Sequence, residues 1–312
     1  MTAPIIEDLE MWLQQGDKRV HISGGELEGA EGITLATTAM GTAFEDVFEA
    51  PFEAIYNSTA FQKGGTYGGL REGMFEFSFA FHIFDTPDRP WRINWSRFRK
   101  MFSAKKPTEL HVKIVGESHR WLSIRLQKTS KLKVEVDPNK LRYGMVMLHM
   151  VGAFPRWIEE DWTWSYTTTT DTRVSGSEVG SVRVANQTNC EQWIKWTCQA
   201  GNEGVIYTLP DFSFGDDRWD NAEDDEDRMI EMPDLYLDEH IVIDTDEFTI
   251  AGQVVSSLDT QVYQRMNGRE FLYPLPAYTD PIDLPILIEG ADIGNVIQVR
   301  VPRTWTHPWG ME

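Results

Sequence analysis

A run of alternating aromatic residues between Met74 and Phe84 constrains the fold of this chain more than any other segment. Every second residue from Phe75 to Ile83 is apolar. Successive side chains of a strand point to opposite faces of its sheet, so this run places one continuous apolar row against a core. The pattern therefore predicts a long β-strand with one buried face. The core residues that we expect from it are Phe75, Phe77, Phe79 and Phe81.

A short helix is predicted directly after this strand. Residues 85–90 include two prolines, which end a strand because proline has a fixed φ and no backbone N–H to donate. The apolar residues that follow, Trp91, Trp95, Phe98 and Phe102, recur with the spacing of an amphipathic helix. The first three complete the predicted core of this region. The opposite face of the helix is expected to be polar, with Asn94, Arg97, Arg99 and Lys100.

The balance of charge excludes several classes of partner. The chain has 29 Lys or Arg and 49 Asp or Glu, which gives a net charge of −20. This charge repels nucleic-acid phosphates and anionic lipid, so we predict no sequence-specific nucleic acid binding and no membrane association. An acidic wall still suits a conduit through which DNA passes without adhering. The sequence shows no apolar run long enough to span a bilayer and no recognisable secretory signal.

The two cysteines indicate a reducing environment. Cys190 and Cys198 lie in one strand-like run, where an extended backbone would separate them by about 26 Å, at about 3.3 Å for each residue. This distance is far beyond the reach of a disulfide. We therefore expect two reduced, buried thiols in a protein that is assembled in the cytoplasm.

Composition divides the chain into two domains. Many short alternating runs and only one helical pattern predict a mainly β protein. Residues 167–180 are rich in threonine, serine and glycine and read as a linker. We place a β-sandwich or split-barrel domain with one short helix at 1–166. The residues 181–312 are expected to form a second antiparallel β-sandwich, of the jelly-roll type.

No pattern in the sequence carries a strong signal for a phosphate or metal site. The glycine-rich segment 64–69 lacks the Gly-Lys-Ser/Thr ending of a phosphate-binding loop and favours a turn. The seven histidines are scattered, without the spacing of a zinc site. The acidic stretch 216–228 does not follow the EF-hand pattern, so a solvated loop is the preferred interpretation and a bound Ca²⁺ stays an open alternative. We predict no cofactor and no metal.

Carbohydrate chemistry is the remaining alternative. Glu159, Glu160 and Asp161 lie near several tryptophans, as in a glycosidase, but adjacent residues on a strand point apart and do not face each other across a cleft. We predict no catalytic residues. Trp193 and Trp219 are candidate sugar-stacking rings, although packing is the commoner role of a large aromatic side chain.

Four segments resemble minor tail proteins of long-tailed actinobacterial phages, and more specifically their distal tail protein. These segments are 81–87 with the helix that begins at Trp91, 209–215, 269–274 and 302–310. The resemblance implies that the first domain forms a ring of six copies below the tail tube, with a central channel for DNA. It also implies that the second domain is galectin-like and points outward. The implied partners are the tail tube protein, the tape measure protein, the baseplate hub or tail tip protein, and receptor-binding proteins or host glycans.

The sequence and this resemblance together predict a structural protein of the virion, located at the distal end of the tail and without enzymatic activity. Two alternatives stay open. The first is a carbohydrate-binding module that uses Trp193 and Trp219 to contact glycans of the host cell envelope. The second, which the residues favour less, is a glycoside hydrolase that acts on the envelope.

Overall fold

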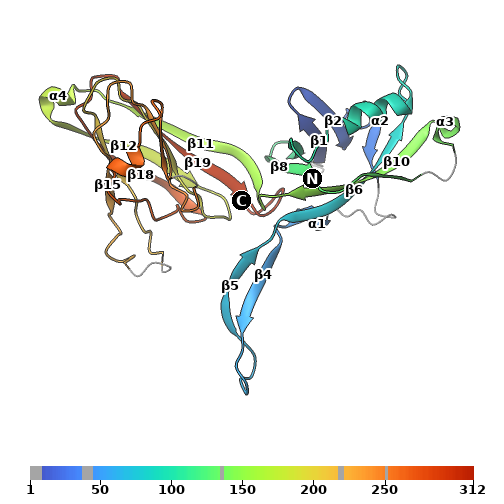
Figure 1. Cartoon of the computed structure of the whole chain (residues 1–312), viewed down its shortest axis with the longest axis horizontal. Helices are drawn as coiled ribbons and strands as arrows, with labels where there is room; N and C mark the ends of the chain where they lie inside the picture. The colour runs from blue at the N-terminus through green and yellow to red at the C-terminus, as the bar shows by residue number, and fades with distance from the viewer. Residues whose placement is uncertain (1–8, 37–44, 134–136, 217–220, 250–251) are drawn as a thin grey trace, which may run out of the picture. The chain divides into compact units, whose positions relative to one another are not determined.

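The computed structural model describes residues 9–36, 45–133, 137–216, 221–249 and 252–312. Over these residues the chain is mainly β, which confirms the expected fold class (Figure 1). It divides into two compact units. The first unit contains the residues up to 159 together with 305–311, and the second contains residues 160–304. None of the helices in the described ranges is long and apolar enough to cross a membrane.

The first unit is built on a long antiparallel pair of strands. β6 (Phe75–Phe84) and β10 (Tyr143–Gly152) pair along their whole lengths. β10 also pairs with β8 (Ser118–Leu126), which in turn meets the first residues of β11 (Trp157–Thr167). The other strands of this sheet in the first unit are β1 (Leu9–Gln15), β2 (Lys18–Ser23), β3 (Ile33–Leu35), β7 (Thr108–Ile114) and β9 (Lys131–Lys133).

The aromatic row of β6 lies in the core of the first unit. Phe75, Phe77, Phe79 and Phe81 are all buried, with exposed fractions between 0% and 4%. Their rings contact one another and the helix: the centroids of Phe77 and Phe79 are 4.9 Å apart, and those of Phe81 and Phe98 are also 4.9 Å apart. The opposite row of β6 is not fully exposed to solvent. Ala80, which belongs to this row, is buried as well.

The helix α2 (Trp91–Arg99) begins immediately after Pro90, where the Asp85 carboxylate accepts a hydrogen bond of 2.7 Å from the Trp91 N–H. Trp91 and Phe98 are buried, and the half-buried Trp95 packs against the same core. The position of Asn94 in the polar half of the helix predicted an exposed side chain, but Asn94 does not lie on an open face. It is buried, and its side-chain amide donates to the carbonyl of Phe84 at 2.9 Å.

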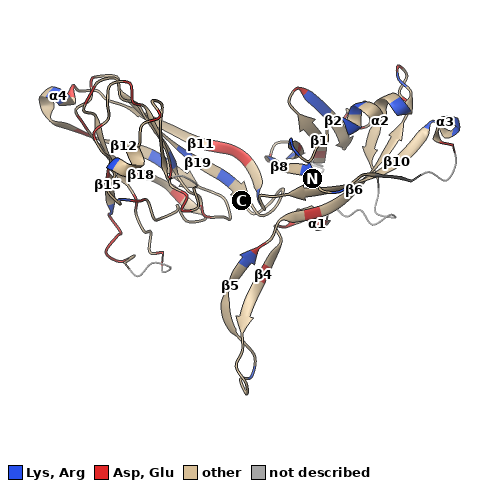
Figure 2. Ribbon diagram, viewed as in Figure 1, with Lys and Arg blue, Asp and Glu red and all other residues tan. Residues whose placement is uncertain are grey.

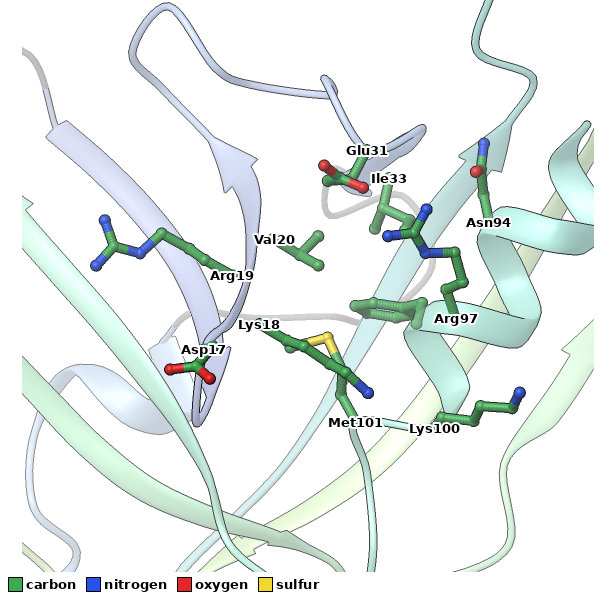
Figure 3. Close-up of a pocket in the computed structure, with 11 residues that line it drawn as sticks. Asp17, Lys18, Arg19, Val20, Glu31, Ile33, Asn94, Arg97, Lys100 and Met101 are labelled. Atoms are coloured by element: carbon green, nitrogen blue, oxygen red, sulfur yellow. The ribbon is translucent and has the colours of Figure 1, made fainter. Parts of the chain in front are cut away.

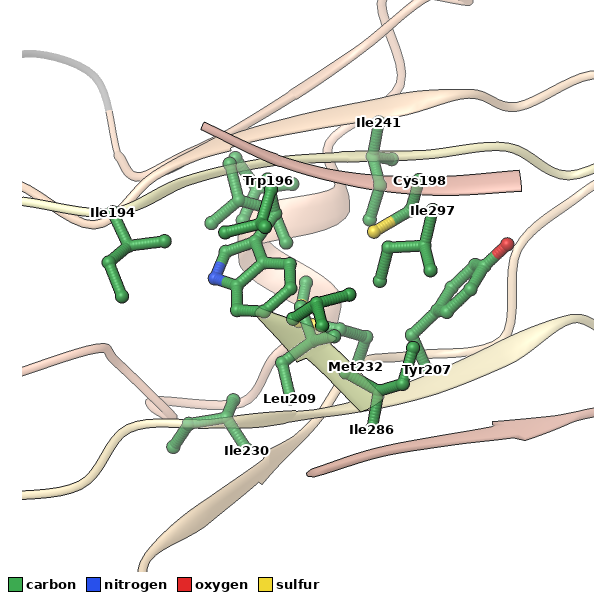
Figure 4. Close-up of a cluster of buried hydrophobic side chains, with 14 of the residues drawn as sticks. Ile194, Trp196, Cys198, Tyr207, Leu209, Ile230, Met232, Ile241, Ile286 and Ile297 are labelled. Carbon is green, nitrogen blue, oxygen red and sulfur yellow. The ribbon is translucent and has the colours of Figure 1, made fainter. Parts of the chain in front are cut away.

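The second unit is a β-sandwich of two antiparallel sheets. The order in one sheet is β12–β18–β14–β15, and in the other it is β17–β16–β13–β19–β11. Figure 4 shows the core between them, where Trp196, Cys198, Tyr207 and Ile286 are fully or almost fully buried. Both cysteines are buried, and they form no disulfide with each other. The strands are β12 (Ser177–Asn186), β13 (Lys195–Cys198), β14 (Ile206–Pro210), β15 (Met229–Glu231), β16 (Ile241–Asp244), β17 (Val254–Ser256), β18 (Thr279–Glu289) and β19 (Val296–Trp305).

The segment 167–180, expected to be a linker, is a folded part of the second unit. It contains the short helix α4 (Thr172–Ser175) and the first residues of β12. The buried carboxylate of Glu178 accepts hydrogen bonds from the backbone and hydroxyl groups of Thr169 and Thr170, and from the hydroxyl of Tyr166. Burial alone would raise the pKa of Glu178, but these hydrogen bonds lower it to about 2. Polar side chains can therefore order this segment without an apolar core.

The end of the chain returns to the first unit. Arg120 on β8 is fully buried, and its guanidinium carbon lies 3.6 Å from the centroid of the Trp305 ring. The same guanidinium donates to the carbonyls of His307 and Gly310, each at 3.0 Å. The Trp305 indole N–H donates to Glu159 at 2.7 Å. Residues 305–311 are thus part of the first unit, and not of the second domain to which their sequence position assigned them.

The net charge of the chain is confined to one unit (Figure 2). The first unit, residues 1–159 and 305–311, has 20 Lys or Arg and 20 Asp or Glu, so its net charge is 20 − 20 = 0. The second unit, residues 160–304 with Glu312, has 9 and 29, so its net charge is 9 − 29 = −20. Electrostatic repulsion between copies of the chain therefore comes mainly from the second unit.

Candidate functional site

The strands β4 (Phe52–Asn57) and β5 (Thr66–Glu72) form a hairpin that is separate from the other sheets. They pair with each other, and no other described strand pairs with either of them. Figure 1 shows this hairpin as an arm of the first unit. An isolated two-stranded hairpin is at best marginally stable in water, because it has no apolar surface to pack against. The hairpin is therefore a candidate surface for a partner.

The side chains of the hairpin support this interpretation. Large apolar side chains on both strands and at the tip are exposed, and Phe61 at the tip is exposed at 104%. Apolar surface that gathers on one exposed element commonly marks an interaction site. We refer to these residues as the hairpin surface. They are Phe52, Ile55, Tyr56, Phe61, Tyr67 and Leu70.

The register of the strands arranges the hairpin surface. Tyr56 pairs with Tyr67, and their ring centroids lie 5.9 Å apart in an edge-to-face arrangement. A bulge between Ile55 and Tyr56 shifts the register at this point. The glycine-rich segment 64–69 forms the end of the turn and the beginning of β5. A Cβ atom on Gly68 would lie 2.6 Å from the Asn57 side-chain amide, so a larger residue at this position would require that side chain to move.

The base of the hairpin is joined to the core of the first unit. The Gly73 N–H donates to the Pro51 carbonyl at 2.9 Å, and Glu72 at the end of β5 forms an ion pair with the largely buried Arg156. The helix α1 (Glu45–Phe48) precedes β4, and its Val47 carbonyl accepts a hydrogen bond of 3.0 Å from the buried Trp157 indole. The arm thus extends from a fixed base, although its own faces are open.

Two of the three carboxylates that the sequence analysis considered and rejected as glycosidase acids have structural roles. Glu159 accepts the Trp305 indole N–H, and Asp161 pairs with Arg300 at 3.3 Å. Glu160, between them, is exposed. The segment therefore does not place two carboxylates together across a cleft, which is the arrangement that glycoside hydrolysis needs.

The predicted sugar and metal sites are only partly described. Trp193 is half-buried in the connection before β13, whereas Trp219 lies outside the described residues. The sugar-binding pair therefore stays a prediction. Among the described residues, no group of three or more His, Cys, Asp or Glu is arranged to hold a metal ion. Part of the acidic stretch, residues 217–220, is outside the described residues, and Asp225 within it accepts a hydrogen bond of 2.6 Å from Tyr273.

A cluster of histidines around Trp12 in the first unit was not predicted from the sequence. The buried ring of His111 stacks on Trp12, with centroids 4.9 Å apart and planes inclined by 5°. One ring nitrogen of His111 lies 3.0 Å from His119, and the other lies 3.2 Å from Glu109. Burial, together with the positive charges of His119 and Arg19, lowers the pKa of His111 to about 3.

We predict that this cluster makes the first unit less stable in acid. Below pH 6.5 the unfolded chain protonates His111, whereas the folded unit keeps it neutral until about pH 3. The free energy of unfolding should therefore fall as the pH falls through this window, by at most about 1.4 kcal/mol per pH unit. Urea unfolding of His111→Gln between pH 7 and pH 4 should show a shallower decrease than the wild type. An unchanged slope would show that His111 is not the source of this pH dependence. The other charged or titratable groups near the His111 ring are His21, His119, Glu109 and Arg19.

Comparison with known proteins gives the context for the hairpin surface. The chain is 26% identical over 264 residues to minor tail protein Gp27 of Mycobacterium phage L5, a match that covers 72% of this chain and 76% of that protein. It is 25% identical, with the same coverage, to minor tail protein Gp27 of Mycobacterium phage D29. The chain is therefore similar, over most of its length, to minor tail proteins of two mycobacteriophages. No family model matches it.

The fold agrees with this relationship. The crystal structure of the SPP1 Dit (gp 19.1) protein, described as a paradigm of the hub adsorption apparatus in phages that infect Gram-positive bacteria, superimposes with a TM-score of 0.56. The sequences are only 8% identical, but the match covers 94% of this chain and 98% of that protein. The resemblance to siphophage distal tail proteins that the sequence suggested is therefore confirmed. The chain has their fold over both units.

Proposed function

We propose that this chain is a structural protein of a phage tail that assembles into a ring at the distal end, between the tail tube and the tail tip or baseplate hub. The observation that carries the proposal is the hairpin surface, on an element that pairs with no other described strand. Its exposed apolar side chains need a partner in the assembled state. The relatives named as minor tail proteins and the Dit-like fold support a position in the tail.

The distribution of charge is compatible with a ring of identical copies. The first unit, which we propose to form the ring, has no net charge, so neighbouring copies of it do not repel each other strongly. The acidic charge, which would be compatible with a non-adhesive channel, belongs to the second unit. The proposed passage of DNA therefore does not depend on an overall acidic ring. The partners that we propose are six copies of the chain, the tail tube protein, the tape measure protein and the hub protein.

Mass photometry of the purified chain tests the ring. Six copies of 35.9 kDa would give 6 × 35.9, or about 215 kDa. Replacing Tyr56 and Leu70 on the hairpin surface by serine should weaken assembly more than ten-fold, because burying each large apolar side chain contributes about 1.5–3 kcal/mol. Lys63→Ser, a change of an exposed polar residue on the same hairpin, is the matched control.

The ring can also require the tail tube protein in order to assemble. If the chain is a monomer alone, the same variants should be compared in a ring assembled on purified tail tube protein, which supplies a template. Assembly that is equally strong in the Tyr56→Ser/Leu70→Ser variant and in the wild type would contradict the role of the hairpin surface. A glycan-binding signal that depends on Trp193 would instead favour the carbohydrate-binding alternative, and clearing of cell walls in zymography would favour the hydrolase.

A further inference from the structure

A basic pocket lies in the first unit, on a chain whose overall charge is strongly acidic. Figure 3 shows this pocket, which has a volume of about 390 Å³ and lies between the β1–β2 turn, β2, the start of β3 and the helix α2. Lys18 and Arg19 come from the strand side, whereas Arg97 and Lys100 come from the end of the helix. All four of these side chains are exposed.

The helix side of the pocket belongs to the most basic stretch of the chain. Residues 89–106 contain seven Lys or Arg and no Asp or Glu. The last turn of α2 is basic, and the first turn carries no acidic residue. Cations near the C-terminal end of a helix are favoured by its dipole, so the helix itself stabilises Arg97 and Lys100 in place. This stretch accounts for seven of the 29 positive residues of the chain.

Several of these cations have no acidic partner of their own. Glu31, one of the two acidic residues in the pocket lining, pairs with Arg89 at 3.1 Å. Arg19 donates to Gln14 and lies over the Trp12 ring, 5.0 Å from its centroid. Within the described ranges, Lys18, Arg97 and Lys100 form no ion pair. The pocket therefore offers three cations that no ion pair of the described residues engages, with Asp88 within electrostatic reach of Arg97.

We propose that this pocket binds an acidic peptide segment, and that the segment comes from the second unit of another copy of this chain. The inference rests on the proposed function, because neighbouring copies meet only in an assembly. Charge complementarity supports it: the second unit carries the whole net charge of −20. Its most acidic described segment is 221–227, in which Glu223, Asp224, Glu226 and Asp227 are exposed. An ion pair at each cation of the pocket would offset the repulsion between acidic units.

A peptide fits the pocket better than a nucleic acid does. The volume of about 390 Å³ has room for a few side chains and not for a strand of DNA. Asp17 and Glu31 in the lining would repel a continuous row of phosphates. A peptide can instead place separate carboxylates opposite Lys18 and Arg97 and leave these two acids uncontacted.

Fluorescence anisotropy with the full chain tests the pocket without requiring a ring. The probe is a labelled peptide with the sequence of residues 221–228, and the control probe has every Asp and Glu replaced by Asn and Gln. The wild type should bind the acidic probe and not the neutral one, and binding should weaken as salt is raised. Lys18→Glu/Arg97→Glu should bind at least ten-fold more weakly. The control Lys105→Glu/Lys106→Glu makes the same charge change at exposed residues outside the pocket lining and should bind normally.

Charge exchange between copies tests the source of the segment. Lys18→Glu/Arg97→Glu should weaken assembly in mass photometry, and adding Asp224→Lys/Glu226→Lys should restore it. Equal binding of the acidic probe by the pocket variant and the wild type overturns the site. Binding of a DNA oligonucleotide, but not of the acidic probe, through Lys18 and Arg97 also overturns it. If the acidic probe binds but Asp224→Lys/Glu226→Lys does not restore assembly, the segment that fills the pocket does not come from a second copy of the chain. If the wild type assembles neither alone nor on purified tail tube protein, the ring is contradicted, and the peptide titration still tests the pocket.

Discussion

Replacing Phe79 by alanine is expected to lower the free energy of unfolding of the first unit by about 3–5 kcal/mol. Phe79 is 1% exposed at the centre of the aromatic row of β6, with its neighbours Phe77 and Phe81 on the same face. The substitution removes a whole ring from a core that can only partly collapse into the space. Most domains are stable by about 5–15 kcal/mol, so this loss would leave the unit close to unfolding at 37 °C.

Urea unfolding followed by tryptophan fluorescence measures this effect, with Phe77→Ala as a parallel variant. Phe61→Ala is the matched control, because it makes the same chemical change at a fully exposed tip and should alter the free energy by less than about 0.5 kcal/mol. Wild-type stability in both Phe77→Ala and Phe79→Ala would mean that β6 does not form the core of the unit.

The parts of the fold that could be predicted are those that a local period determines. The alternation of Phe75 to Ile83 and the helical spacing from Trp91 each specify a buried face, and the structure has a strand and a helix at these positions. The same reasoning failed for Asn94, which lies in the polar half of the helix but is buried beneath it. Its side-chain amide donates to the Phe84 carbonyl, and no periodicity reveals such a hydrogen bond.

The boundary of the units could not be predicted, because it depends on contacts between residues far apart in the sequence. A segment of threonines looks like a linker until Glu178 is placed where it can accept their hydrogen bonds. The hairpin surface presents the opposite problem. Phe52, Ile55 and Tyr56 have the composition of a buried strand, and the sequence alone does not reveal that their strand pairs only with β5 among the described strands. Apolar composition indicates that a strand needs a partner, and not whether that partner lies in the same chain.

Arg120 was missed for a related reason, although a signal was present. It lies in phase with Leu122 and Ile124 on β8, so the strand period places it in the buried row. A fully buried arginine is rare unless other groups pair with it. Its partners are carbonyls and a ring near the end of the chain, about 190 residues away, as the hydrogen bond to Gly310 shows. Long-range pairing of this kind leaves no pattern in the local sequence.

Arg120→Ala is expected to release residues 305–311 from the first unit and to lower its free energy of unfolding by about 3–5 kcal/mol. The change removes the donor to the His307 and Gly310 carbonyls, uncovers the face of Trp305 and leaves Glu159 without the nearby cation. Hydrogen exchange should become faster in 305–311, while the core of the second unit keeps its protection.

Arg120→Lys should give an intermediate effect, because an ammonium keeps the charge but lacks the planar fork of the guanidinium. Arg125→Ala, at an exposed position of the same strand, is the control. Unchanged exchange in 305–311 of the Arg120→Ala variant would show that Trp305 and its neighbours are held by apolar packing alone.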